Sequence, residues 1–223
     1  MYEKIFFLIL SSLIMIVSVV SCKKEEFSDY ESDTDYTIIT MDDLKAINGD
    51  NLEIEYDFGR IETIDGEIAY FPVTDKDKAY EAFMGIAKLL GIENTEDFVY
   101  NETASHENPN GLNNYYFQQY YKGVKIYGAY VQITVNPQHT EWTSTYSSYI
   151  PNLDIDTEPQ ISEEEAIERT ESKYNTTVCG NPKLVISDKK LSWDMELSDS
   201  ETYRIIMRAD NGEVIYEDKM IID

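Results

Sequence analysis

Cysteine and histidine are both scarce in this chain. Its 223 residues include two cysteines, Cys22 and Cys179, and two histidines, His106 and His139. Two cysteines cannot form the disulfide framework that holds many small secreted folds together, so stability has to come from a hydrophobic core. With 42% hydrophobic residues, the chain is long enough to build one large domain or two small ones.

Basic residues are also scarce in this chain. Lysine and arginine total 18 against 43 aspartates and glutamates, which gives a formal net charge of −25. Such a negative field repels phosphate backbones and anionic headgroups, so nucleic acid is excluded as a partner, whereas basic or metal-bearing partners are favoured. Simple solubility of a surface protein explains the same charge without any partner.

No apolar run in the chain is long enough to span a membrane. The N-terminus reads MYEKIFFLILSSLIMIVSVVSC, where a short charged start leads into the apolar run from Ile5 to Val20. These 16 residues fall short of the roughly 20 that a spanning helix needs, and Ser11 and Ser12 interrupt them. We therefore predict that residues 1–21 are a signal peptide.

The apolar run ends in Val19-Val20-Ser21-Cys22, which resembles the lipobox of bacterial lipoproteins. The resemblance implies cleavage before Cys22, lipidation of that cysteine with acyl chains such as palmitate, and an extracytoplasmic protein anchored to the cell membrane or outer membrane. Each buried acyl CH₂ contributes about 0.8 kcal/mol, so several chains hold the protein without a spanning helix. Residues 23–26 (KKEE) are similar to the acidic export signals of some surface lipoproteins, which implies surface exposure.

Sequence patterns divide the mature chain into three regions. Residues 22–50 are acidic and poor in periodic apolar residues, which predicts a disordered tether. Residues 51–150 and 151–223 carry folded patterns, and the prolines within residues 150–160 mark the boundary between them. We expect an α+β fold of two small units, each with a helix on an antiparallel sheet.

The first folded region opens with a predicted hairpin and a predicted helix. Residues 61–71 indicate a hairpin around Asp65-Gly66, because aspartate-glycine supplies the positive φ angles of a tight turn. Apolar residues at helical spacing then predict a helix of about four turns, which starts at Thr74 or Asp75 and ends at Gly91.

Alternating residues from Phe98 onward predict antiparallel strands. The stretch YYFQQYYKGVKIYGAYVQITV (115–135) contains two strand-like runs joined at Lys122-Gly123. A third strand around Trp142 completes a meander. One face of the second run is expected to be core, and it carries Tyr127, Ala129, Val131, Ile133 and Val135.

The second folded region begins with a helix and ends with four strands. Ser162 and Glu165 have the spacing of a capping box, in which each side chain binds the backbone amide of the other residue. After Pro182 follow the runs KLVIS, LSWDMEL, TYRIIMRA and EVIYEDKMII, the last two joined around Asn211-Gly212. This order predicts a helix that covers one face of an antiparallel sheet.

These stretches resemble the propeptides of thermolysin-family metallopeptidases over roughly residues 97 to 220. Residues 115–136 are similar to the fungalysin/thermolysin propeptide motif, with its Phe-Gln-Gln, its Tyr-Lys-Gly and a Gly-Ala on the next strand. The region after residue 150 is similar to a PepSY domain. There are two departures: the strand after Ile133 lacks the usual histidine, and residues 136–138 (NPQ) replace the glycine of the following turn.

The resemblance implies a protein that folds early, assists the folding of a peptidase and blocks its cleft. We expect that no peptidase domain follows Asp223. We therefore expect a propeptide-like lipoprotein whose partner is a separate thermolysin-like metallopeptidase or another envelope protein. Two other hypotheses stay open: a surface module that binds peptides, glycans or an envelope component, and a remnant enzyme.

The residue sets that catalysis requires are not evident. A zinc peptidase needs two histidines one helical turn apart, with a glutamate beside the first. The segment HENPN (106–110) has asparagine in the fifth position and a proline that would break the helix. Cys179 is more simply a buried or idle thiol than a nucleophile, and no carboxylate pair stands out as that of a glycosidase. We expect no catalytic residue, no bound metal and no cofactor.

Polar and aromatic side chains of the predicted hairpin are the candidates for partner binding. Tyrosine makes good contacts at low entropic cost, and an open sheet edge can pair with an extended segment of a partner. Packing of aromatic residues across strands is the simpler explanation for the same tyrosines. The candidates are Tyr116, Gln118, Tyr120, Tyr130 and Gln132.

Overall fold

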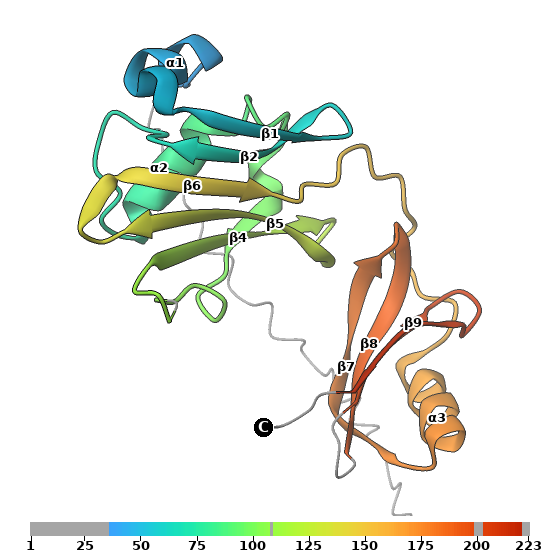
Figure 1. Ribbon diagram of the computed structural model, residues 1–223. Helices are drawn as coiled ribbons and strands as arrows, with labels where there is room; N and C mark the ends of the chain where they lie inside the picture. The colour runs from blue at the N-terminus through green and yellow to red at the C-terminus, as the bar shows by residue number, and fades with distance from the viewer. Residues whose placement is uncertain (1–35, 108, 199–202, 220–223) are drawn as a thin grey trace, which may run out of the picture. The chain divides into compact units, whose positions relative to one another are not determined.

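The computed structural model describes residues 36–107, 109–198 and 203–219 (Figure 1). The predicted signal peptide, the predicted lipid anchor at Cys22 and residues 22–35 of the predicted tether lie outside these ranges. None of the described helices is long and apolar enough to cross a membrane.

The described chain contains three α-helices, two short 3₁₀ helices (Gly49–Asn51 and Thr95–Asp97) and ten strands. The helices are α1 (Met41–Asn48), α2 (Lys76–Ile86) and α3 (Glu163–Tyr174). The first six strands are β1 (Glu53–Asp57), β2 (Arg60–Gly66), β3 (Phe98–Tyr100), β4 (Asn113–Tyr121), β5 (Val124–Asn136) and β6 (His139–Ser147). The last four are β7 (Thr177–Ser187), β8 (Lys190–Ser198), β9 (Tyr203–Arg208) and β10 (Val214–Lys219).

The ten described strands form one mostly antiparallel sheet, which confirms the predicted α+β class. The strand order is β1-β2-β6-β5-β7-β8-β9-β10, and β4 pairs with β5 and β3 beside this path. The start of β5 pairs in parallel with β7, through Lys125 with Val185 and Ile126 with Ile186. Two hydrophobic cores result, one among the N-terminal elements and one among the C-terminal elements.

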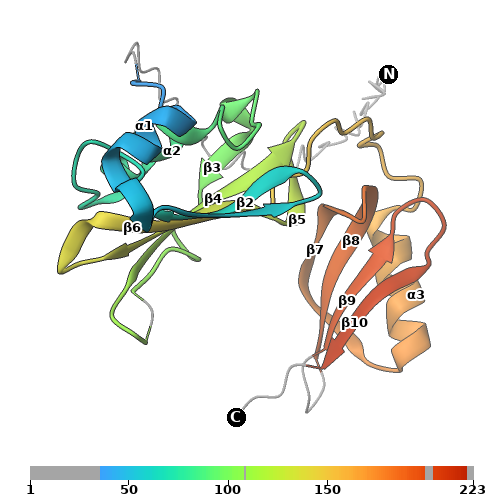
Figure 2. The ribbon, with the colours of Figure 1, turned by 45° about the horizontal axis from the view of Figure 1, so that its top comes forward.

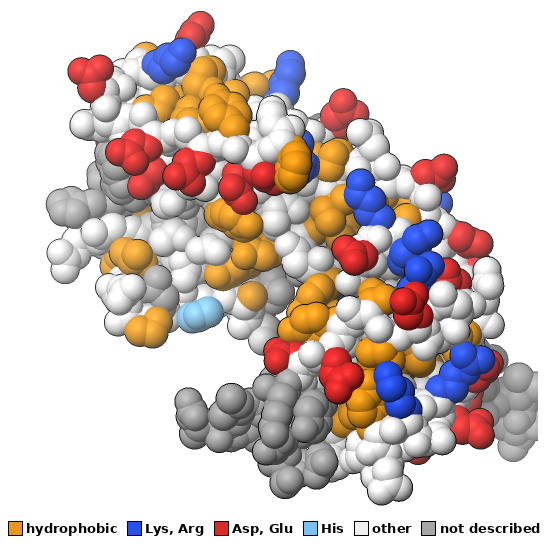
Figure 3. Space-filling model, turned by 45° about the vertical axis from the view of Figure 1, so that its right-hand side comes forward, with side chains coloured by type: hydrophobic (Ala, Val, Ile, Leu, Met, Phe, Trp, Pro, Cys, Tyr) orange, Lys and Arg blue, Asp and Glu red, His pale blue; other side chains and the backbone are white. Residues whose placement is uncertain are grey.

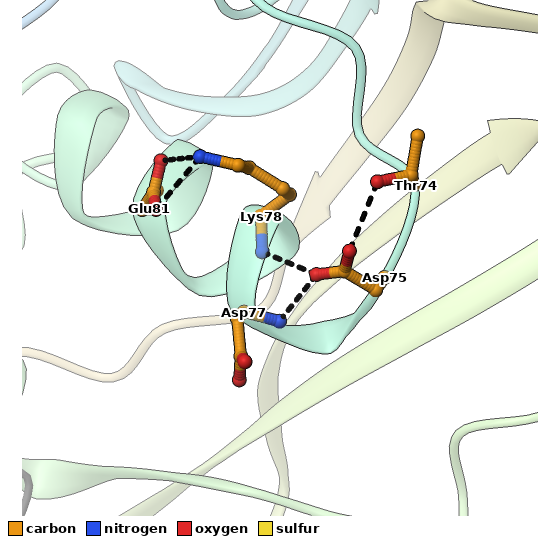
Figure 4. Close-up of polar contacts among 5 residues, drawn as sticks. All are labelled: Thr74, Asp75, Asp77, Lys78 and Glu81. Atoms are coloured by element: carbon orange, nitrogen blue, oxygen red, sulfur yellow. Dashed lines mark hydrogen bonds and ion pairs between the residues drawn. The ribbon is translucent and has the colours of Figure 1, made fainter.

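The N-terminal core is built around α2, which lies on one face of the strands β1, β2, β4, β5 and β6 (Figure 1). Phe83 of α2 stacks on Phe117 of β4, with ring centroids 4.8 Å apart and planes 12° apart. The helix begins where predicted, because Asp75 accepts hydrogen bonds from the amides of Asp77 and Lys78 (Figure 4). Such an N-cap satisfies amides that the first helical turn leaves unpaired.

Ordered structure begins closer to the N-terminus than we predicted from the sequence. Residues 41–48 of the predicted tether form α1, so the tether prediction is wrong for residues 36–50. Thr40 and Asp43 form a reciprocal capping box at the start of this helix, and Leu44 is completely buried. The capping residues and one apolar side chain therefore outweigh the acidic composition that had indicated disorder.

The first hairpin is also placed differently. The turn lies at Phe58-Gly59, between β1 and β2, and not at Asp65-Gly66. Gly66 ends β2, where Asn48 packs so closely that a Cβ on this residue would lie 2.6 Å from the Asn48 Oδ1 atom. The glycine thus permits a close side-chain approach rather than a tight turn.

The C-terminal unit has the predicted arrangement of one helix on four antiparallel strands, and α3 lies along one face of them (Figure 2). Ser162 caps α3 by accepting from the amide of Glu165, but the Glu165 carboxylate pairs with Arg169 and does not complete a capping box. Trp193 of β8 is buried in the core, and its indole nitrogen donates to the Ile161 carbonyl at 2.9 Å. This bond fixes the chain just before α3 to the sheet.

Candidate partner-binding surface

The β4–β5 hairpin is built as its sequence predicted. Lys122 and Gly123 occupy the turn with φ angles of 48° and 79°, and Tyr121 pairs with Val124 across it. Two successive positive φ angles are the signature of the type I′ turn, which matches the twist of antiparallel strands.

One face of β5 is buried, as expected, and it serves both cores. Val131, Ile133 and Val135 are fully buried in the N-terminal core. Ile126 and Ala129 belong to the C-terminal core, three residues apart rather than two. The alternation is interrupted at Gly128, whose φ is 74°, opposite an irregularity in the register of β4. Tyr127, which was predicted on the core face, is only half-buried.

Gln118 fills the irregularity between the two strands. Its side chain is 6% exposed, and its amide nitrogen lies 2.7 Å from the Ala129 carbonyl oxygen and 2.8 Å from that of Ile126. The pairing of β4 with β5 shifts at this point, and the glutamine amide supplies a buried donor to both carbonyls. Gln118 is therefore a structural residue, and its prediction as a partner-binding residue is wrong.

Gln119 holds the segment that follows β6. Its amide nitrogen donates to the Ile150 carbonyl at 2.9 Å, and its amide oxygen accepts from the Ile150 nitrogen at 3.0 Å. The side chain is 3% exposed, so both bonds form away from solvent. Together with the stacked Phe117, the two glutamines show that the Phe-Gln-Gln motif specifies internal structure.

Three tyrosines form a ladder across the opposite face of β4, β5 and β6. We use the term tyrosine face for Tyr116, Tyr130 and Tyr146. The ring centroids of Tyr116 and Tyr130 are 5.3 Å apart, and those of Tyr130 and Tyr146 are 5.7 Å apart. All three side chains are half-buried, so each ring presents an edge or part of a face to solvent.

Acidic groups lie beside the tyrosine face. Burial raises the pKa of Tyr146, and the carboxylates of Glu62 and Asp57 raise it further. Burial also raises the pKa of Tyr130, with its two neighbouring tyrosines adding to the shift. These phenols therefore stay neutral at physiological pH. Hydrophobic and acidic side chains gather next to one another on the face that Figure 3 shows.

A small open hollow of about 160 Å³ adjoins Tyr146. Arg60, Asp57 and Glu62 contribute charged groups to its lining, together with residues 146–150. The Arg60 guanidinium donates to the Tyr149 carbonyl and so lies fixed in the hollow. The arrangement can receive one polar side chain next to an aromatic platform, which is the chemistry of a protein–protein contact.

The remaining candidates are less available than the tyrosine face. The Gln132 amide donates to Thr134 Oγ1 at 2.7 Å and to Asn114 Oδ1 at 3.2 Å, so a partner would have to compete for it. Tyr120 is half-buried and lies opposite Lys125 in the sheet, away from the ladder. Sequence alternation could not separate these residues, because it assigns faces but not hydrogen-bond partners.

The described residues contain no cluster of three or more histidine, cysteine, aspartate or glutamate side chains suited to a metal. His106 lies in a non-helical segment, and its Nδ1 contacts the Ala104 carbonyl oxygen at 2.5 Å. Cys179 is an exposed free thiol rather than a buried one. The side chain of His139 lies outside the described part of the chain.

The family model of the Fungalysin/Thermolysin Propeptide Motif matches residues 100–140, which include β4, β5 and their turn. The chain therefore carries this propeptide motif, as the Phe-Gln-Gln and Tyr-Lys-Gly residues predicted. A comparison with curated protein sequences gave no match.

Two solved structures are similar to this chain at low identity. The C-terminal domain of Bacillus megaterium YpeB is 19% identical with a TM-score of 0.41, over 77% of this chain and 76% of that one. A protein described as a lipoprotein, CD1622 from Clostridium difficile 630, is 11% identical with a TM-score of 0.28, over 70% of this chain and 99% of that one. At such low TM-scores neither likeness supports a conclusion about function.

Proposed function

We propose that this protein is a non-catalytic, membrane-anchored binding protein that acts on a separate thermolysin-like metallopeptidase outside the cytoplasm, inhibiting it or assisting its folding. The match of residues 100–140 to the propeptide motif is the observation that supports this most strongly. In this proposal, lipidation of Cys22 holds the protein at the membrane surface, where it meets exported enzymes.

The tyrosine face is the contact surface in this proposal. Aromatic rings with few rotatable bonds lose little entropy on binding, and Tyr is enriched in the centres of interfaces. The ladder is preformed by contacts among its own rings, so a partner does not have to order it. The negative surface charge favours approach to a partner with positive charge or bound cations.

Inhibition and co-purification with thermolysin-like peptidases encoded in the same genome test the proposal. The full chain in detergent is mixed with each mature peptidase and, separately, with each peptidase diluted from denaturant. A fall in peptidase activity supports inhibition, and a higher yield of active enzyme after refolding supports assisted folding. No binding to any of these peptidases at micromolar concentration overturns the proposal.

Paired variants locate the contact. Tyr116→Ser combined with Tyr130→Ser is expected to weaken binding at least about tenfold, because two central aromatic contacts are lost. Tyr70→Ser is the matched control, since Tyr70 is 62% exposed and lies outside the tyrosine face. Equal weakening by both variants would show that the peptidase binds elsewhere.

The tyrosine ladder also favours a second candidate function, a surface module for peptides or glycans. Sugar rings and peptide side chains both stack on partly exposed aromatic rings. Recovery of a peptide or glycan that binds the wild type but not the double tyrosine variant, with no peptidase bound, would favour this function over the first.

A further inference from the structure

The edge strand β1 and its turn form a surface that the proposed function does not use. β1 pairs only with β2 among the described strands and stands at the end of the sheet order. One side of an edge strand keeps backbone amides and carbonyls that another extended chain can pair with. The tyrosine face involves β4, β5 and β6 instead.

Two aromatic side chains are exposed at this edge. Phe58, in the turn, is 94% exposed, and Tyr56, near the end of β1, is 59% exposed. Phe58 is the most exposed of the large hydrophobic side chains in the described chain. Its φ of 46° lies in the left-handed region, where a bulky residue is unusual and asparagine or glycine is preferred. Neither folding nor solubility benefits from phenylalanine at this position.

Carboxylates on the same hairpin determine the charge of a suitable partner. Glu53 lies directly opposite Asp65, and Glu55 follows on the same face of β1. No ion pair involves any of these three carboxylates in the described chain. Like charges directly opposite one another destabilise a strand pair, so an opposite charge from outside would relieve a cost within the fold.

Protection of the β1 edge against aggregation explains its charged residues but not its exposed aromatic residues. Charged side chains on an edge strand discourage unwanted pairing, which accounts for Glu53 and Glu55. Exposed aromatic residues have the opposite effect, because they add apolar surface at the place where chains pair. Protection alone therefore leaves Phe58 and Tyr56 unexplained.

We infer that β1 and Phe58 form a docking site for an extended segment of a partner protein that carries lysine or arginine at alternate positions. A segment paired with β1 would place such side chains about 5 Å from Glu53 and Glu55, on the same face of the sheet. Where the segment passes the turn, Phe58 offers an apolar and cation-binding ring. A second copy of this chain fits poorly, since it would bring a net charge of −25 against the same charge.

A synthetic peptide provides the test. The probe is an acetylated peptide of about nine residues that alternates lysine and valine, long enough to cover β1 and pass Phe58. Its affinity for the full chain is measured in about 0.15 M salt, which screens long-range attraction. Hydrogen exchange of residues 53–57 is measured with and without the peptide. The expected result is saturable binding with slower exchange in β1.

Matched variants and a matched peptide separate docking from general attraction. Glu53→Gln with Glu55→Gln is expected to weaken binding about tenfold, and Phe58→Asn severalfold. Glu164→Gln with Glu168→Gln removes the same charge from the exposed surface of α3 and should leave affinity within about twofold. Equal weakening by both double variants would overturn the inference. So would equal binding of a peptide with the same composition but paired lysines, or binding without slower exchange in β1.

Discussion

Two hairpins of this sheet share a turn geometry and differ in almost everything around it. Phe58-Gly59 between β1 and β2 has φ angles of 46° and 79°, and Lys122-Gly123 between β4 and β5 has 48° and 79°. The β4–β5 hairpin carries the propeptide motif, and Phe117, Gln118 and Gln119 are all buried in the protein. The β1–β2 hairpin lies outside the matched residues 100–140 and exposes its aromatic turn residue, Phe58.

The two hairpins show that a recognisable sequence motif and a surface available to a partner are different properties. Gln118 and Gln119 are recognisable because the strand irregularity and the segment after β6 need buried amides. Residues that meet a partner have no such internal constraint. In this protein they are to be sought on the tyrosine face and at the β1 edge, where side chains are partly or fully exposed.

The largest expected contrast in stability is between alanine substitutions of Phe117 and Phe58. Phe117→Ala should lower the free energy of unfolding by about 3 to 5 kcal/mol, because it removes a fully buried ring and leaves a cavity beside Phe83. Phe58→Ala should change it by less than about 0.5 kcal/mol. Urea denaturation of the full chain measures both. A small loss for Phe117→Ala would contradict the described core.

Substitutions of Gln118 and Gln132 compare a buried amide with a half-buried one. Gln118→Ala should lower the free energy of unfolding by about 2 kcal/mol, since the Ile126 and Ala129 carbonyls lose a buried donor. Gln132→Ala serves as the matched control on the half-buried face and should cost clearly less. Equal losses for the two variants in urea denaturation would mean that Gln118 has no special role.

The helix that supports the β4–β5 hairpin has a pH-dependent cap. Asp75→Ala should cost about 1 kcal/mol at neutral pH, because two amides at the start of α2 lose their acceptor. Hydrogen bonds from the Lys78 amide and from Thr74 lower the pKa of Asp75 in the folded protein. The cap therefore stabilises above the unfolded pKa of about 3.9 and loses its effect as pH falls through the lower folded value. Thermal unfolding at neutral and acidic pH should show this cost shrinking with acidity.

At the exposed hairpin the expected change has the opposite sign. Phe58→Asn should raise the free energy of unfolding by about 1 kcal/mol, because asparagine tolerates the left-handed conformation that phenylalanine adopts here. Lys122→Asn, the same change in the other hairpin, should raise the free energy of unfolding less, because it also removes the Lys122 ammonium from the Tyr121 ring, whose centroid lies 4.9 Å away. A loss of stability in Phe58→Asn would mean that the ring makes contacts that the exposed fraction does not reveal.

The smallest expected change in stability concerns Glu53 and Asp65, whose carboxylates lie opposite one another. Glu53→Thr should raise the free energy of unfolding by a few tenths of a kcal/mol, since it removes the like charge opposite Asp65. Added salt should shrink the gain, because it screens exposed charges. A gain that persists at high salt would point to strand propensity rather than charge.

Features that depend on local sequence pattern could be predicted from the sequence. The alternation in the second half of β5, the Lys122-Gly123 turn and the caps at Asp75 and Ser162 are local features, and the structure confirms them. The predicted turn at Asp65-Gly66 was wrong, although an aspartate-glycine pair is a strong turn signal. Glycine is needed at position 66 because the side chain of Asn48, distant in sequence, packs against it.

The candidate surface was harder to predict than the fold. Gln118 falls on the polar face by alternation, but the shifted register between β4 and β5 buries it. Tyr116 and Tyr130 remain partly exposed, and their role in partner binding stays a prediction. Tyr146 completes the ladder from β6, and only the strand pairing of β5 with β6 shows that it belongs there.

Side-chain footprinting of the complex tests the central proposal most directly. Hydroxyl radicals oxidise accessible tyrosines, so their rates in the full chain report exposure with and without a bound thermolysin-like peptidase. We expect Tyr116, Tyr130 and Tyr146 to become protected from oxidation in the complex while Tyr70 does not. A complex that leaves all three oxidised at the free rate, or the absence of any complex, would contradict the proposal.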